Sequence, residues 1–169
     1  EYMGKKAISR LRGKSPGFGL QGAAAATTSP RNRKTMAVQL VAHVKIRSGT
    51  CIKVKAKVDV DAQSFAINLG QNESELVLHF NPRFDSQGDV KTIICNSKTC
   101  GEWGEEIRQS AFPFQQGEEF KLFVCFDAQQ ILVKMQKGEE LLFPNRLEID
   151  TAEYFSIVGD LRIKAVRFD

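Results

Sequence analysis

From residue 38 onward, the chain alternates between apolar and polar residues in short runs that are separated by Gly-, Pro- and Asn-containing turns. The run 51–60 shows the alternation most clearly, with apolar residues facing lysines: Ile52, Val54, Ala56 and Val58 against Lys53, Lys55 and Lys57. Successive side chains of a strand point to opposite faces, so this run predicts an antiparallel strand with one buried and one solvated face.

The same pattern predicts ten strands and almost no helix. The predicted strands are 38–46, 51–60, 65–69, 76–80, 90–96, 120–126, 130–135, 139–143, 155–158 and 161–168. Turns are expected at Asp85–Asp89 and at Lys137-Gly138, and one short helical turn is expected within Leu147–Tyr154. Many short strands separated by turns indicate an all-β fold, either a β-sandwich or a barrel.

Charge divides the 169 residues into two parts. Residues 1–35 carry eight basic residues against one acidic residue, a formal +7, which leaves about −3 for residues 36–169 because the whole chain carries +4. We expect 1–35 to be a basic, disordered, solvated extension; the alternative is attraction to anionic membranes or nucleic acid. Met36 opens the predicted domain and is a candidate initiator. A mildly acidic domain is a poor partner for nucleic acid.

The four cysteines form no CxxC motif and lie far from the two histidines, so we expect no metal site. They are Cys51, Cys95, Cys100 and Cys125. A domain of this size does not need disulfides, and nothing near residue 1 looks like a secretory signal, so we expect four free thiols, with Cys100 the most exposed. No apolar run approaches the roughly 20 residues that span a bilayer.

Polar side chains gather on one face of the predicted strand around residue 79. Alternation places His79, Asn81 and Arg83 on one face, while Leu78 and Phe80 point into the core on the other. An imidazole, an amide and a guanidinium in a row provide fixed hydrogen-bond donors and acceptors on a rigid platform. This face holds no obvious nucleophile.

A second group follows along the chain. Asn96 ends the next strand, and Trp103, Glu106 and Arg108 form a W-x-x-E-x-R arrangement in which the carboxylate and the guanidinium are expected to pair. A flat indole beside polar groups suits a pyranose, whose C–H face stacks on an aromatic ring and whose hydroxyls need paired donors and acceptors. Galactose fits well because its axial 4-hydroxyl leaves one continuous apolar ring face.

H-x-N-x-R, a later Asn and W-x-x-E-x-R together resemble the carbohydrate-recognition signature of the galectin family, most closely the prototype single-domain members. Flanking segments are also similar: Leu69-Gly70, Phe112-Pro113-Phe114, Phe143-Pro144-Asn145-Arg146 and Val166-Arg167-Phe168-Asp169. The resemblance covers residues 36–169. It implies a jelly-roll-like β-sandwich of two antiparallel sheets that binds β-galactosides such as lactose without metal, cofactor or catalysis.

By position, the resemblance assigns roles to the galactose contacts. His79, Asn81 and Arg83 would bind the 4-hydroxyl, and Asn96 and Glu106 would bind the 6-hydroxyl.

The remaining roles concern the ring face and the neighbouring sugar. Trp103 would stack under the galactose ring, and Arg83, Glu106 and Arg108 would reach an adjacent glucose or N-acetylglucosamine. Gln87 departs from the family pattern, because several prototype members have a ligand-contacting His in that loop. The departure bears on extended glycans rather than on galactose.

The resemblance also implies partners and location. It implies a homodimer joined through the terminal strands 38–46 and 161–168, which would crosslink glycoproteins and glycolipids that carry β-galactosides. The expected location is cytoplasmic, with secretion to the extracellular space or matrix without a signal peptide. An alternative is a structural relative with weak or no sugar binding. A glycosidase would need two carboxylates about 5 to 9.5 Å apart, and the motif provides only Glu106.

Overall fold

The computed structural model describes residues 35–169, so the predicted N-terminal extension lies outside the described residues except for Thr35. The larger sheet is built from β1 (Val38–Ala42), β4 (Phe65–Asn72), β5 (Glu75–Ser86), β6 (Asp89–Thr99), β7 (Glu102–Trp103), β8 (Ile107–Gln109) and β13 (Tyr154–Gly159). The second sheet is built from β3 (Cys51–Val58), β9 (Glu119–Phe126), β10 (Gln130–Lys134), β11 (Glu140–Pro144) and β14 (Leu161–Phe168). A small pair is formed by β2 (Ile46–Arg47) and β12 (Thr151–Ala152).

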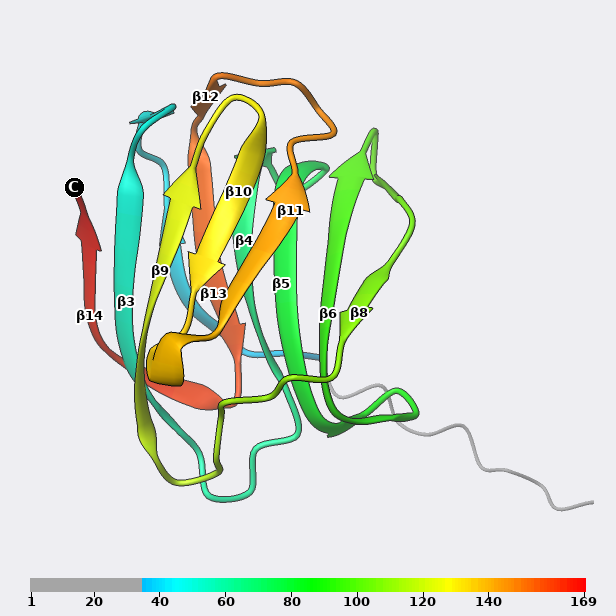
Figure 1. The fold of residues 1–169 in the computed structure, drawn as a ribbon, viewed down its shortest axis with the longest axis vertical. Helices are drawn as coiled ribbons and strands as arrows, with labels where there is room; N and C mark the ends of the chain where they lie inside the picture. The colour runs from blue at the N-terminus through cyan, green and yellow to red at the C-terminus, as the bar shows by residue number, and fades with distance from the viewer. Residues whose placement is uncertain (1–34) are drawn as a thin grey trace, which may run out of the picture. The chain divides into compact units, whose positions relative to one another are not determined.

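The two large sheets form an antiparallel β-sandwich, which confirms the predicted fold class. The seven-stranded sheet has the order β1-β13-β4-β5-β6-β7, with β8 also paired to β6, and the five-stranded sheet has the order β11-β10-β9-β3-β14. Figure 1 shows the five-stranded sheet in front of β4, β5 and β13. Within residues 35–169, the one helical element is the 3₁₀ turn Gln136–Gly138, and no helix has the length and apolar character needed to cross a membrane.

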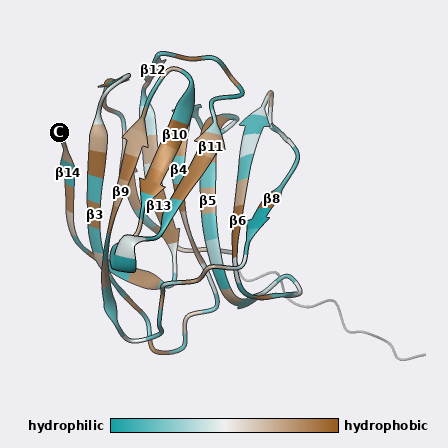
Figure 2. Cartoon of the chain, in the orientation of Figure 1, coloured by the Kyte–Doolittle hydropathy of each residue, from teal (hydrophilic) through white to brown (hydrophobic). Residues whose placement is uncertain are grey.

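Apolar side chains from the facing sides of the two sheets fill the space between them. Phe65, Phe80, Phe126, Phe143 and Phe155 are the largest fully buried side chains. Each such ring contributes roughly 1.5–3 kcal/mol on burial. Bands of apolar and polar residues alternate along β3 in Figure 2, as the sequence predicts.

Two local predictions are wrong. The predicted strand 38–46 is interrupted after Ala42, and β2 pairs separately with β12. The predicted helical turn within Leu147–Tyr154 is absent. Asn145 holds this segment instead, because its Nδ2 donates to the carbonyls of Asp127 and Ile149 at 3.2 and 2.7 Å. These side-chain hydrogen bonds take the place of helical ones.

Both predicted turns are present. Gln87 and Gly88 connect β5 and β6 with φ of 52° and 86°, and the strands pair directly on either side, Ser86 opposite Asp89. Positive φ at both positions defines the two-residue hairpin turn whose twist matches the flanking strands. Lys137 and Gly138 form the turn between β10 and β11.

The expectation of four free thiols is wrong, because Cys51 and Cys125 form a disulfide. They lie directly opposite each other on β3 and β9. Alternation along each strand indicates which face a cysteine occupies, but not which residue faces it on the neighbouring strand. Cys95 and Cys100 are free, and Cys100 is exposed as expected. Burial raises the pKa of the Cys95 thiol to about 12.

Reduction of the disulfide should lower the free energy of unfolding. The bond joins residues 74 positions apart, and the loop-closure estimate for such a loop is about 4 kcal/mol. Denaturant titration with and without reductant measures the loss of unfolding free energy. The Cys100→Ser variant is the control, and its free energy of unfolding should equal that of the unaltered protein. Four titratable thiols in the unreduced, unfolded protein would contradict the disulfide.

Candidate functional site

A row of polar side chains crosses the outer face of the seven-stranded sheet. Ser156 of β13 lies opposite Asn68 of β4, Asn68 lies opposite His79 of β5, and His79 lies opposite Asn96 of β6. Residues opposite each other in an antiparallel pair share a face, so strand register alone brings these four side chains together. Ser156, Asn68 and Asn96 are buried, and His79 is half-buried.

Hydrogen bonds along this row determine which nitrogen of His79 carries the proton. Asn68 donates through Nδ2 to Ser156 Oγ at 3.1 Å, and its Oδ1 lies 2.6 Å from His79 Nδ1. An amide oxygen can only accept, so the proton is on Nδ1 and Nε2 keeps a free lone pair. Burial, together with the positive charges of Arg83 and Lys98, lowers the pKa of His79 to about 4. His79 is therefore a neutral acceptor near pH 7.

Asn81 and Arg83 follow on the same face of β5 and hold each other in place. Asn81 Nδ2 donates to the Phe65 carbonyl at 2.7 Å, and its Oδ1 accepts from Arg83 Nε at 2.9 Å. Arg83 Nη1 reaches Asp89 at 2.7 Å, and only 7% of the Arg83 side chain is exposed. The opposite face of the strand carries core residues, as predicted: Leu78, Phe80 and Phe84 are buried.

Asp89 joins the two arginines of the site. It lies directly after the Gln87–Gly88 turn, accepts from Arg83 on one oxygen, and accepts from Arg108 Nε on the other at 3.3 Å. Burial alone would raise the pKa of Asp89, but the hydrogen bonds from Arg83 and Arg108 outweigh it, and the pKa is lowered. Arg108 also pairs with Glu106 at 2.8 Å, as expected from the sequence.

Asn96 is anchored to the loop that follows β7. Its Nδ2 donates to the Gly104 carbonyl at 3.0 Å, while Arg146 Nη1 donates to the Glu105 carbonyl at 2.9 Å and to Ser97 Oγ at 3.2 Å. A Cβ added at Gly104 would lie 3.0–3.2 Å from side-chain atoms of Asn96, Ser97 and Arg146. This close packing holds the loop between Trp103 and Glu106 against the sheet.

Trp103 stands beside His79 as an open aromatic surface. The ring centroids are 4.7 Å apart at 53°, and Lys98 Nζ lies over the indole at 4.7 Å. Half of Trp103 is exposed, whereas a core Trp would be buried. An exposed indole fixed beside hydrogen-bonding groups can stack on a flat apolar surface.

All seven site residues predicted from the sequence lie on neighbouring strands or the loop between them. They are His79, Asn81, Arg83, Asn96, Trp103, Glu106 and Arg108, on β5, β6, β7, the 104–106 loop and β8. Four supporting residues were missed: Asn68, Ser156, Asp89 and Arg146. Arg146 stands in one of the family-like flanking segments, and Asp89 follows the predicted turn, but nothing in the sequence gives their partners.

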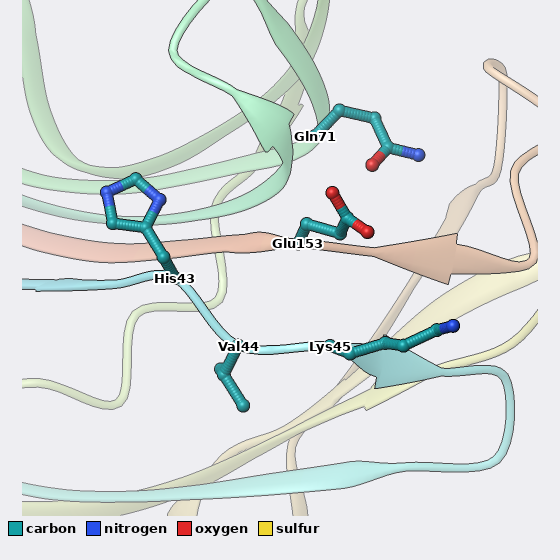
Figure 3. A pocket seen from close by; sticks show the side chains of 5 residues that line it. All are labelled: His43, Val44, Lys45, Gln71 and Glu153. Atoms are coloured by element: carbon teal, nitrogen blue, oxygen red, sulfur yellow. The ribbon is translucent and has the colours of Figure 1, made fainter.

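A shallow hollow of about 280 Å³ lies elsewhere, lined by His43, Val44, Lys45, Gln71 and Glu153 (Figure 3). None of the predicted site residues lines it. Figure 3 shows Lys45 extending away from His43 rather than converging with it on one point.

Among residues 35–169, no group of three or more His, Cys, Asp or Glu side chains could hold a metal ion.

The buried imidazole should resist protonation. We expect an NMR titration of the His79 ring to give a midpoint near 4 rather than 6.5. Because the folded pKa lies below the unfolded one, His79 costs no stability above pH 6.5, and the fold loses stability as pH falls from about 6.5 towards 4. A midpoint near 6.5 would contradict the buried, Asn68-bonded imidazole.

Comparison with known proteins places the chain in a family. The family model described as galactoside-binding lectin matches residues 37–168. The 16 kDa beta-galactoside-binding lectin of Gallus gallus is 46% identical over 129 residues, which cover 76% of this chain and 96% of that protein. Galectin-1 of Bos taurus is 46% identical over 135 residues, which cover 79% of this chain and 100% of that protein.

Solved structures give the same result. CG-16, a homodimeric agglutinin from chicken liver, superposes with a TM-score of 0.75 at 46% identity over 77% of this chain and 98% of that chain. A complex of toad ovary galectin with thio-digalactose gives 0.74 at 36% identity over 77% of this chain and 97% of that chain. With the family model covering residues 37–168, the chain belongs to the galactoside-binding lectins, the galectin family.

Proposed function

We propose that the outer face of the seven-stranded sheet binds β-galactosides, such as lactose and N-acetyllactosamine-type glycans, without a metal ion. One observation carries the proposal: His79 presents a bare acceptor on the face of β5 that also carries Asn81 and Arg83. The amide and the guanidinium each have N–H groups beyond the ones that donate within the protein. A hydroxyl placed among them can donate to His79 Nε2 and accept from the other two. The axial 4-hydroxyl of galactose would satisfy all three, whereas an epimer would leave buried polar groups unpaired.

The surrounding residues would complete the sugar site. Trp103 offers the stacking surface, and Asn96 and Glu106 would take the 6-hydroxyl. Arg108, held by Asp89 and Glu106, would reach the next sugar together with Arg83. Gln87 is exposed at the tip of the β5–β6 turn, so it would affect extended glycans more than galactose itself.

The acids of the site are unsuited to glycoside hydrolysis. A general acid in this chemistry needs a raised pKa. Asp89 has a lowered pKa, and Glu106 pairs with Arg108 at 2.8 Å. A lectin is therefore favoured over a glycosidase, in keeping with a lectin family.

A homodimer would give two sugar sites that crosslink glycoproteins or glycolipids. The strands β1 and β14 end their respective sheets and contact each other, so two unpaired strand edges lie side by side. Val38, Val41 and Phe168 are exposed there. Strand edges of this kind suit a symmetric contact, and the structural relative CG-16 is described as homodimeric. We also propose that the protein is located in the cytoplasm and is secreted to the extracellular space or matrix without a signal peptide.

The direct test is retention on lactose-agarose with elution by lactose and not by sucrose. Trp103→Ala should weaken lactose affinity about tenfold or more in calorimetry, as expected for an exposed aromatic anchor. Val60→Ala, at an exposed apolar residue away from the predicted site, should leave it unchanged. No retention of the folded protein would favour the alternative, a structural relative with weak or no sugar binding.

Asp89→Asn should separate the two arginines without removing a direct galactose contact. The neutral amide loses the charge-assisted hydrogen bonds to Arg83 and Arg108, so lactose affinity should fall roughly tenfold. Asp85→Asn, at an exposed acid four positions away, is the matched control. Equal affinities for the two variants would show that Asp89 does not order the arginines.

A further inference from the structure

The outer face of the five-stranded sheet collects basic residues from four strands. Alternation places them there, since their neighbours in the chain point into the core. This basic face consists of Lys53, Lys55, Lys57, Lys121, Lys134, Arg162, Lys164 and Arg167.

The basic face holds a large share of the positive charge of residues 36–169. Residues 36–169 hold 16 basic and 19 acidic residues, a formal −3. Half of those 16 lie on the basic face, and the acids on the same face are Glu119 and Glu140. The face therefore carries a formal +6 on a domain that is acidic elsewhere.

Strand register places like charges directly opposite each other. Lys53 faces Arg167 and Lys57 faces Arg162 across the β3–β14 pair. Lys55 faces Lys121 across β3–β9. Like charges directly opposite on a sheet are destabilising, and the acids opposite Lys57 and Lys134, Glu119 and Glu140, offset this only in part. The three like-charge pairs point to a role outside folding.

Little of this charge is neutralised within the protein. Glu119 pairs with Lys55 at 3.9 Å and with Lys164 at 4.0 Å. Across residues 35–169, the other six basic residues of the face lie in no ion pair shorter than 4.0 Å, and Lys53 sits 5.8 Å from the centroid of the Phe123 ring.

Exposed apolar side chains border the charges. Leu142 is 58% exposed and Phe123 is 37% exposed, both on the outer side of their strands. The charges extend over four adjacent strands, about 14 Å across at a strand spacing of about 4.8 Å, and about 13 Å along β3 from Lys53 to Lys57. A face that spreads over four strands and carries exposed apolar side chains matches a bilayer surface better than it matches a single linear chain.

We propose that this basic face docks the protein onto anionic phospholipid membranes. Six of its eight cations are lysines, which act as flexible point charges rather than as forks aimed at one phosphate, and polybasic surfaces gain from an anionic leaflet in this general way. Phe123 and Leu142 would enter the headgroup region. The face belongs to the sheet opposite the one that carries the sugar site, so a docked protein would keep that site open to glycans.

The test is co-sedimentation of the full-length chain with phosphatidylcholine vesicles that contain or lack phosphatidylserine. Saturating lactose is present so that sugar binding does not contribute. We expect binding only to the phosphatidylserine vesicles, and release at high salt. Absence of binding to these vesicles would overturn the proposal and leave the lactose-column result untouched.

A matched pair of triple variants assigns the binding to this face. Lys53→Gln, Lys55→Gln and Lys57→Gln together should weaken vesicle partitioning roughly tenfold or more. The control changes Lys45, Arg47 and Lys91, three exposed basic residues that lie outside the five-stranded sheet, to Gln. The thermal midpoint of the first variant should not fall, because like-charge pairs are removed. Equal losses in both variants would assign binding to the basic N-terminal residues or to net charge, and overturn the proposal.

A heparin column distinguishes binding to a sulfated polysaccharide from binding to a membrane. Retention on heparin that the Lys53, Lys55 and Lys57 triple variant weakens, without vesicle binding by the unaltered protein, would show that the face binds a sulfated chain and that the membrane proposal is wrong.

Discussion

The need to pair every buried polar group governs this molecule. Asn68, Asn81, Arg83, Asn96 and Ser156 are buried in the seven-stranded sheet. In the described part of the chain, no buried side-chain nitrogen or oxygen lacks a hydrogen-bond partner. An unpaired buried group costs about 1–3 kcal/mol, so each side chain is confined to the arrangement that satisfies its neighbours. The site is thus ordered before any ligand arrives, and binding need not supply that order.

The outer faces of the two sheets carry different kinds of side chain. On the larger sheet, register aligns amides, an imidazole and arginines into neighbouring hydrogen-bonded groups, and the arginines Arg83 and Arg108 are paired with the acids Asp89 and Glu106. On the smaller sheet, the same register aligns lysines and arginines without enough acids to neutralise them. The core between them is apolar and holds both faces rigid, which explains how one small domain can present two independent surfaces.

Much of this could be predicted from local sequence because the side-chain period of a strand is two. The faces of residues 51–58 and 78–84, the all-β fold and both hairpin turns follow from that rule and from turn chemistry. Relations between strands could not be predicted in the same way. The Cys51–Cys125 disulfide and the Asn68–His79 hydrogen bond depend on which strands are neighbours and in what register. Two-residue strands such as β7 are too short to show a period.

Nitrogen-15 spectroscopy of the His79 ring, in the free protein and with lactose added, is the most direct test of whether His79 is a preorganised acceptor for a sugar hydroxyl. The structure predicts a neutral ring with its proton on Nδ1, where Asn68 accepts it, and a shift of the Nε2 resonance when a sugar hydroxyl donates to it. A proton found on Nε2, or an Nε2 resonance that saturating lactose leaves unmoved, would show that His79 is not the acceptor for a sugar hydroxyl.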